Sequence, residues 1–229
     1  MTITLYDTLS KSMKTFQPQT GKRVTMYVCG PTVYDFPHVG NARPAIVFDI
    51  LYRLLKSAYP SVLYARNYTD IDDKIFAVAS ETGVSYREVT KKFIAAYRED
   101  MQRLGVLTPS SEPRVTDNIN EIIRMISDLI EKKFAYIADG HVLFEVNKFQ
   151  DYGKLSKRNQ EQMLAGARVE VAPYKRNPAD FVLWKPSKNG DPGWDSDWSY
   201  GRPGWHIECS AMSRKIFSSS IDIHGGGMD

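Results

Sequence analysis

Residues 26–43 contain the first side chains that could do chemistry, in the sequence MYVCGPTVYDFPHVGNAR. An apolar run ends at Cys29, a loop with two prolines follows, and His38, Gly40 and Asn41 then precede an amphipathic stretch. That order predicts a strand, a loop and a helix N-terminus, which offers N–H groups and a partial positive charge to phosphate. An imidazole there could donate to an α-phosphate under attack, and Gly40 would let the ligand approach the backbone. Taken alone, a histidine at such a position is more often an ordinary polar loop residue.

The two cysteines are the second candidate set. Cys29 ends the predicted strand, and Cys209 lies in the first turns of a predicted helix, where the pKa of a thiol is lowered. Two thiolates with two further ligands would form a tetrahedral zinc site. The four histidines have no tight metal-site spacing to either cysteine, so two buried, inert thiols remain the alternative.

A glycine-rich segment follows the last predicted strand, as His224, three consecutive glycines, Met228 and Asp229. Bare backbone at residues 225–227 would let a planar ring lie against the chain, and the carboxylate of Asp229 could accept from ribose hydroxyls. A flexible turn is the alternative. Three glycines cost backbone entropy, which favours a ligand site.

Residues 67–74, NYTDIDDK, place three carboxylates and a threonine just after another predicted strand. In an open α/β sheet the ligand binds at that edge. Thr69, Asp70 or Asp72 could instead cap the helix that follows, and capping and ligand contact can coexist.

The elements that must position these residues follow from apolar spacing. Continuous apolar runs predict buried strands over residues 24–29 and 62–65, and a short strand is predicted over residues 3–6. A helix is predicted from about residue 43 to Pro60, with an apolar stripe packed on the sheet. The stripe consists of Val47, Ile50, Leu51, Leu54 and Leu55. Strand, helix and strand within about forty residues form a βαβ unit with a right-handed crossover.

Further along the chain, Ser85 and Glu88 form a capping box that opens a helix, and Asp117 or Asn118 opens another. Residues 135–200 are predicted to be an inserted, irregular or β subdomain, with strands over residues 141–146, 169–171 and 181–184. A helix is predicted to open within residues 201–210, and a short strand to cover residues 221–223.

The composition excludes some classes of protein. The chain has 229 residues, of which 42% are apolar and 25% charged, which is typical of a globular protein with a substantial core. A net charge of +3 is far from that of a compact basic nucleic-acid-binding module. We find no signal peptide and no apolar run of ~18–20 residues, so a cytoplasmic protein without a membrane partner is expected.

Five motifs occur together and in order, and the chain resembles the N-terminal half of the cysteinyl-tRNA synthetases, a class I aminoacyl-tRNA synthetase family. The motifs are MYVCGPTVYDFPHVGNAR, RNYTDIDDKI, KRNPADFVLWK, GRPGWHIECSAM and DIHGGGMD. The resemblance runs from about residue 3 to the last residue. It implies an α/β fold, namely a Rossmann-like class I catalytic domain with a HUP-type parallel sheet. Residues 1–134 would form its first half, 135–200 the connective-peptide insertion and 201–229 the start of the second half, with the C-terminal part of the domain missing.

The resemblance also assigns roles to residues. Residues 38–41 would be the HIGH signature, in which Asn41 replaces the second histidine, and His38 and Asn41 would be catalytic. The expected ATP-binding residues are His38, Gly40, Asn41, Gly225, Gly226, Gly227 and Asp229. The expected substrate-binding residues are Gly30, Thr69, Asp70, Trp205 and His224, of which Asp70 is extrapolated from its position alone. Cys29 and Cys209 would bind one zinc ion, with a histidine and a glutamate beyond the chain end as the other ligands.

The reaction that the family implies has two steps. Cysteine and ATP with Mg²⁺ give cysteinyl-adenylate, and the aminoacyl group then passes to tRNA(Cys). An apolar pocket separates isosteric ligands only about 10–200-fold, whereas a zinc ion that coordinates thiolate would reject serine. The expected partners are tRNA(Cys), cysteine and ATP, and a monomer is expected.

Two alternatives remain at this point. A related ligase could join cysteine to an amino sugar, and a non-catalytic fragment could bind a nucleotide or a protein partner. The long insertion favours tRNA. Residues 1–229 alone are expected to give no cysteine-dependent pyrophosphate exchange and to hold zinc weakly.

Overall fold

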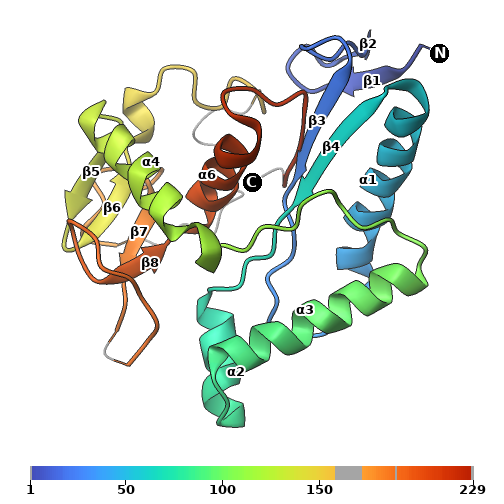
Figure 1. Ribbon diagram of the computed structural model, residues 1–229. Coiled ribbons are helices and arrows are strands. Elements are labelled where there is room, and N and C mark those ends of the chain that lie inside the picture. Colours follow the sequence, from blue (N-terminus) through green and yellow to red (C-terminus); the bar gives the residue numbers. More distant parts are fainter. Residues whose placement is uncertain (1, 158–171, 189, 228–229) are drawn as a thin grey trace. The chain divides into compact units, whose positions relative to one another are not determined.

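The chain divides into two compact units in the computed structural model, which describes residues 2–157, 172–188 and 190–227 (Figure 1). The parallel-sheet unit comprises Gln17–Asn118 and Met212–Gly226. The antiparallel-sheet unit comprises Met1–Phe16, Ile119–Ala211 and Gly227–Asp229. Each unit is described by itself.

The parallel-sheet unit is built on β3 (Arg23–Val28), which lies between β4 (Ser61–Arg66) and β9 (Ile223–Gly225). Both pairings are parallel, with Val28 opposite Arg66 on one side and Gly225 on the other. The strands predicted over residues 24–29 and 62–65 are confirmed within one residue at each end. Since all three strands run the same way, their carboxyl ends meet at one edge.

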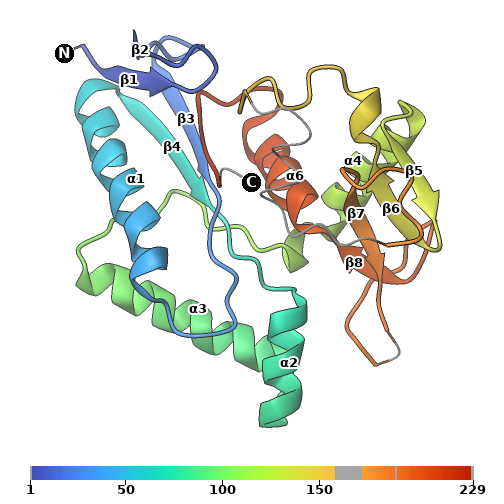
Figure 2. The same ribbon diagram turned by 180° about the vertical axis from the view of Figure 1, so that it is seen from behind.

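Helix α1 (Val39–Ala58) joins β3 to β4 and confirms the βαβ unit; it lies beside β4 in both views (Figures 1 and 2). It begins four residues before the predicted start, because His38 caps it.

The predicted buried stripe of α1 is wrong in part. Its buried residues are Ala45, Asp49, Tyr52 and Leu55, whereas Val47 and Ile50 are 54% and 62% exposed. Asp49 is buried because its carboxylate accepts from Leu107 N at 2.9 Å and from Arg53 Nε at 2.8 Å. Apolar spacing therefore identified the helix, but a polar contact made 58 residues away sets which face is buried.

Two further helices, α2 (Asp73–Thr82) and α3 (Tyr86–Arg103), follow β4. Asp72 caps α2 by accepting from Lys74 N, and the predicted capping box of Ser85 and Glu88 opens α3. The helices share a core with the loop after β3. The members of this core include Val33, Tyr68, Ile75, Val89, Phe93 and Tyr97.

Strand β9 begins two residues after the predicted start at residue 221, because Asp222 makes side-chain contacts instead of strand pairs. Its Oδ2 accepts from Thr25 N at 2.8 Å and from Thr25 Oγ1 at 2.9 Å, and its Oδ1 accepts from Gln19 N at 2.8 Å. One carboxylate thus joins the start of β9 to β3.

The antiparallel-sheet unit holds a four-stranded sheet with the order β5-β6-β7-β8. The strands are β5 (Ala135–Ala138), β6 (His141–Phe144), β7 (Phe181–Pro186) and β8 (Gly201–Pro203). The strands predicted over residues 141–146 and 181–184 are confirmed as β6 and β7, and the one over residues 169–171 lies outside the described residues. β6 ends early because Val146 N donates to the buried Asp180 carboxylate.

The remaining elements refine the other predictions. The helix expected within residues 201–210 begins at Trp205, because residues 201–203 form β8. The strand predicted over residues 3–6 is β1 (Thr4–Asp7), and its partner β2 (Ser12–Thr15) was not predicted because its segment is largely polar. The other elements not yet named are η1 (Thr116–Asn118), α4 (Ile119–Glu131), η2 (Val146–Lys148) and α6 (Trp205–Phe217). Among the described helices, none combines the length and apolar character that a membrane span requires.

Replacement of Asp222 by alanine should destabilise the parallel-sheet unit. The change leaves the N–H of the buried Thr25 without its acceptor, and we expect the free energy of unfolding to fall by about 2–3 kcal/mol. Urea unfolding measures the effect, and Asp222→Asn, which keeps one acceptor oxygen, should lose less. An alanine variant that unfolds at the wild-type urea concentration would contradict the role given to Asp222.

Candidate functional site

The loops that follow the three parallel strands are joined at the carboxyl edge of the sheet. Cys29 N donates to Gly225 O at 2.8 Å, and Gly30 N donates to Asn67 Oδ1 at 2.9 Å. The end of β3 is therefore hydrogen-bonded to Gly225 at the end of β9 and to Asn67 directly after β4, so the segments that follow β3 and β4 meet at this edge.

Glycine is required at two positions of this edge by close packing. A Cβ on Gly30 would lie 1.6 Å from Asn67 O, and a Cβ on Gly225 would lie 2.3 Å from the Phe48 ring. Backbone and ring atoms at these distances exclude any larger residue. Gly30 and Gly225, predicted to contact substrate and ATP, thus have packing roles whether or not a ligand is present.

The predicted HIGH segment forms a capping box at the start of α1. The Nδ1 of His38 accepts from Gly40 N at 3.0 Å, and the Oδ1 of Asn41 accepts from His38 N at 3.1 Å. A Cβ on Gly40 would lie 2.6 Å from His38 Cε1. Gly40, expected to admit a ligand, therefore makes room for the imidazole ring of His38.

This geometry sets the chemistry that the capping residues offer. Because Nδ1 of His38 accepts a hydrogen bond, the neutral ring carries its proton on Nε2 and can donate from there. The Oδ1 of Asn41 is engaged, so Nδ2 is the donor of that amide. His38 and Asn41 line a cleft with Thr32, Phe93 and Tyr97. His38 and Asn41 thus each keep a donor, and the helix that they cap begins beside this cleft, which is a combination that suits an anion.

Thr69 and Asp70 hold the loop after β4 in place. Thr69 N donates to Pro31 O at 3.1 Å, and Val33 N donates to Thr69 O at 3.2 Å. Both carboxylate oxygens of Asp70 accept from Thr116, from the N–H at 3.0 Å and from the hydroxyl at 2.6 Å. Burial raises the pKa of Asp70. These contacts give Asp70 a structural role, and its contact with substrate stays a prediction.

His224 lies beside Tyr27 on the neighbouring strand. The two rings stack with centroids 5.9 Å apart and planes 5° apart, and burial lowers the pKa of the imidazole. The surroundings of the ring therefore favour its neutral form. Of the predicted adenosine-binding residues, Gly226 follows in the same unit, Gly227 belongs to the antiparallel-sheet unit, and Asp229 lies outside the described residues.

The two cysteines belong to different units, and they do not form a disulfide. Cys29 is exposed at the carboxyl edge of the parallel sheet, so the alternative of two buried thiols is wrong for this residue. Cys209 is partly exposed in the first turns of α6, in the part of that helix that belongs to the antiparallel-sheet unit, one turn after Trp205, which is 57% exposed. Within residues 2–157, 172–188 and 190–227, no three His, Cys, Asp or Glu side chains form a group that could hold a metal.

Sequence reasoning assigned no role to Arg66, which lines a second cleft with Tyr97 and with the predicted residues Cys29, Gly30 and Asn41. Its signal in the sequence was its place as the first residue of the motif RNYTDIDDKI, directly after the apolar run VLYA.

Comparisons with known proteins agree with the motifs. A family model described as the tRNA synthetases class I (C) catalytic domain matches residues 15–229. The cysteine–tRNA ligase of Parvibaculum lavamentivorans is 59% identical over 227 residues, which are 99% of this chain and 48% of that protein. The cysteine–tRNA ligase of Xylella fastidiosa is 56% identical and is covered to 49% of its length. The chain thus spans about half the length of the curated relatives it matches.

A solved structure shares the fold at low sequence identity. The methionyl-tRNA synthetase of Mycobacterium tuberculosis, in complex with methionyl-adenylate, superimposes with a TM-score of 0.57 and 13% identity. The match covers 87% of this chain and 47% of that protein. At this identity the likeness shows the fold alone.

Replacement of Gly40 by alanine should displace the His38 ring from the helix start. Loss of the cap should lower the free energy of unfolding by about 1 kcal/mol, and the neutral ring should become a mixture of tautomers. Denaturant unfolding and ¹⁵N NMR of the imidazole measure the two effects. As a control, His38→Asn keeps a capping oxygen and should stay near wild-type stability. A Gly40→Ala protein with full stability and a pure Nε2–H ring would contradict the role given to Gly40.

Proposed function

Because this chain belongs to the family of class I (C) tRNA synthetase catalytic domains, we propose that it is the amino-terminal half of a cysteine–tRNA ligase. The observation that carries the proposal is 59% identity along 99% of the chain to a protein of that name. The proposed activity is ATP-dependent activation of cysteine, followed by transfer to tRNA(Cys). In this proposal the protein is a cytoplasmic monomer.

The start of α1 supports the role proposed for ATP. In the first step a carboxylate oxygen of cysteine attacks the α-phosphorus of ATP, which is bound with Mg²⁺, and pyrophosphate leaves. The Nε2–H of His38, the Nδ2 of Asn41 and the helix N-terminus can donate to phosphate oxygens as they gain charge. Gly225, Gly226 and the residues after them would hold the adenosine.

The second step needs positioning more than acid or base chemistry. The terminal ribose hydroxyl of the tRNA attacks the carbonyl carbon of the adenylate, and AMP leaves. Gly30, Thr69 and Trp205 are the residues proposed to hold the amino acid in place. No side chain of the protein needs to form a covalent bond with substrate, because the adenylate is already activated.

The two cysteine thiols are of a type that binds zinc, but two ligands are fewer than a zinc site needs. Cys29 and Cys209 are soft donors of the type that structural and catalytic zinc sites use, and Cys29 is exposed at the proposed substrate edge. Four donors are needed, and the described residues bring no three together. We propose that these two thiols bind zinc together with donors from outside the described residues. When bound, the ion would coordinate the substrate thiol and so distinguish cysteine from serine.

The acceptor of the aminoacyl group is proposed to be tRNA and not an amino sugar. The relatives that match at 54–59% identity carry the name cysteine–tRNA ligase. An amino-sugar acceptor is an outcome that the experiment below distinguishes.

A chimera tests the proposal directly. Residues 1–229 are joined to the half of the Parvibaculum lavamentivorans ligase that they do not cover. We expect exchange of pyrophosphate into ATP that depends on cysteine and not on serine, and transfer of cysteine to tRNA but not to an amino sugar. His38→Ala should lower exchange about 100-fold, because it removes a donor to the phosphate. Cys29→Ala should raise the KM for cysteine and reduce the preference over serine.

The matched control is His141→Ala, which removes a histidine of the antiparallel-sheet unit that stacks on Tyr174. Its exchange rate should equal that of the unmodified chimera. A chimera that unfolds cooperatively but gives no cysteine-dependent exchange, while the parent ligase is active, would overturn the proposal.

A further inference from the structure

We propose that Arg66 is the cation of a buried subsite that binds an oxyanion of the substrates, either the carboxylate of the amino acid or a phosphate of the nucleotide. Arg66 is the last residue of β4, and it lines a cleft together with Cys29. This inference rests on the proposed function for the identity of the ligand, but not for the existence of the subsite.

The guanidinium of Arg66 is buried without enough partners. The residue is 4% exposed, and its Nε and Nη1 have no hydrogen-bond acceptor in the described part of the chain. An arginine keeps its charge at any ordinary pH, so it cannot escape the cost of burial by losing a proton. A group in this state is expected to take an acceptor from outside the protein.

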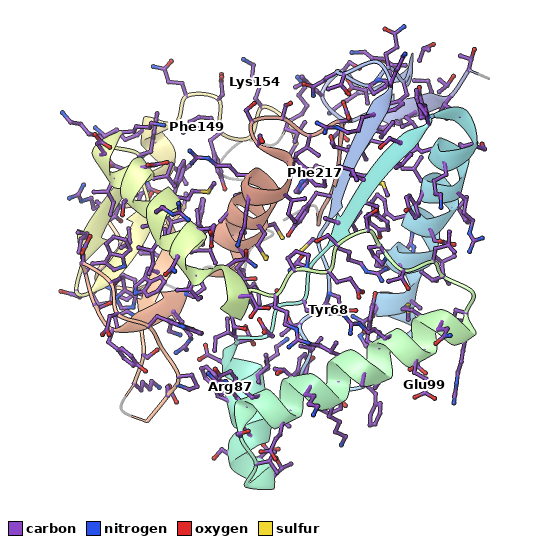
Figure 3. All side chains as sticks on the ribbon, in the orientation of Figure 1. Tyr68, Arg87, Glu99, Phe149, Lys154 and Phe217 are labelled. Carbon is purple, nitrogen blue, oxygen red and sulfur yellow. The ribbon has the colours of Figure 1, made fainter. Side chains whose placement is uncertain are left out.

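The nearest carboxylate, Glu112, is already engaged by other groups. Its Oε2 accepts from Arg98 Nη2 at 2.8 Å and from Arg98 Nε at 3.0 Å, and its Oε1 accepts from Tyr68 Oη at 2.6 Å (Tyr68 is labelled in Figure 3). Arg66 Nη2 lies 3.9 Å from Glu112 Oε1, beyond hydrogen-bond distance. Two guanidinium groups thus share one carboxylate, which leaves one positive charge without a counterion in this cluster.

The tyrosines around Arg66 do not supply the missing charge. Burial raises the pKa of Tyr64 to about 12 and also raises the pKa of Tyr97, so both phenols are neutral at pH 7. The Tyr97 ring instead lies 5.3 Å from the guanidinium carbon, a cation–π contact that restricts the position of the group. Because these tyrosines are neutral, they do not balance the positive charge of Arg66, and an anionic ligand could do so.

The residues that line the cleft include groups that could bind such a ligand. Gly30 lies over the Arg66 stem, since a Cβ on Gly30 would lie 3.4 Å from Arg66 Cγ. Gly40 and Asn41 bring the start of α1 to the same cleft, so a helix N-terminus and a buried cation line one space. The planar fork of a guanidinium matches a carboxylate or a phosphate with two parallel hydrogen bonds. In the proposed reaction these two groups meet at the α-phosphorus.

Thermal unfolding of the 229-residue chain tests the subsite without any assumption about the reaction. Sodium acetate and inorganic phosphate are compared with sodium chloride at equal ionic strength. We expect at least one of the two anions to raise the Tm of the wild type, because a ligand that binds only the folded state stabilises it. Arg66→Gln should abolish the rise. The matched control is Arg103→Gln, which removes an exposed arginine that pairs with Glu99 and does not line the cleft, and it should keep the rise.

A second variant covers the case in which Arg66→Gln does not fold. Arg66→Lys keeps the charge and removes the planar fork, so it should keep less than half of the rise in Tm. A rise in Tm that is equal in the wild type and in whichever Arg66 variant folds would overturn the proposal, as would no rise in the wild type with either anion.

Two pairs of ligands then identify the source of the oxyanion. The comparison of AMP with adenosine reports a phosphate, and that of L-cysteine with cysteamine reports a carboxylate. In one of these pairs, the ligand that carries the oxyanion should bind the wild type at least tenfold more tightly than the ligand that lacks it, and Arg66→Gln should remove this difference. If Arg66 had only a structural role, the variant would bind both ligands of the pair more weakly by the same factor.

The chimera separates this inference from the proposed function. Cysteine-dependent exchange with an unchanged KM for both substrates in Arg66→Gln would overturn the subsite and leave the function standing. If anion binding depends on Arg66 but the chimera does not use cysteine, the subsite stands and the proposed function is overturned.

Discussion

The parallel pairing of β3 with both β4 and β9 is the constraint on which the candidate site depends. Parallel strands end at the same edge, so segments that are far apart in the sequence meet there. The hydrogen bonds of Cys29 N to Gly225 O and of Gly30 N to Asn67 Oδ1 fix that meeting. The Gly30 backbone comes so close to Asn67 that a side chain would not fit, and this packing sets the walls of the cleft.

Several polar residues at this edge stabilise the fold with one atom and leave another for a ligand. His38 caps α1 through Nδ1, which places the proton of the neutral ring on Nε2. Asn41 uses Oδ1 in the same capping box and keeps its Nδ2 donors. Asp72 caps α2, and Asp70 holds Thr116 with both oxygens. Capping and ligand binding are therefore compatible at the start of α1, whereas the Asp70 carboxylate is already occupied.

Two buried charged residues differ in how fully their hydrogen-bonding groups are satisfied. The Asp180 carboxylate, in the antiparallel-sheet unit, accepts from Tyr136 Oη at 2.8 Å, Val146 N at 3.0 Å and Asn177 N at 3.1 Å. A buried charge with that many donors is a stable part of a core. Arg66 is buried to a similar extent, but within the described residues two of its nitrogens have no acceptor, and this difference is the basis of the oxyanion subsite proposed above.

Sequence alone determined the elements that local pattern can report. Apolar periodicity located β3, β4 and α1, and the motifs placed Cys29 and His38 after β3 as candidate site residues, because both signals depend on neighbours in the chain. Tertiary structure decided which face of α1 is buried, where β9 begins and that Arg66 lines the cleft. The physical reason is the range of the contacts: Asp49 meets Leu107 across 58 residues, and Asp222 meets Thr25 across 197. No periodicity encodes such partners, since they exist only once the strands have paired.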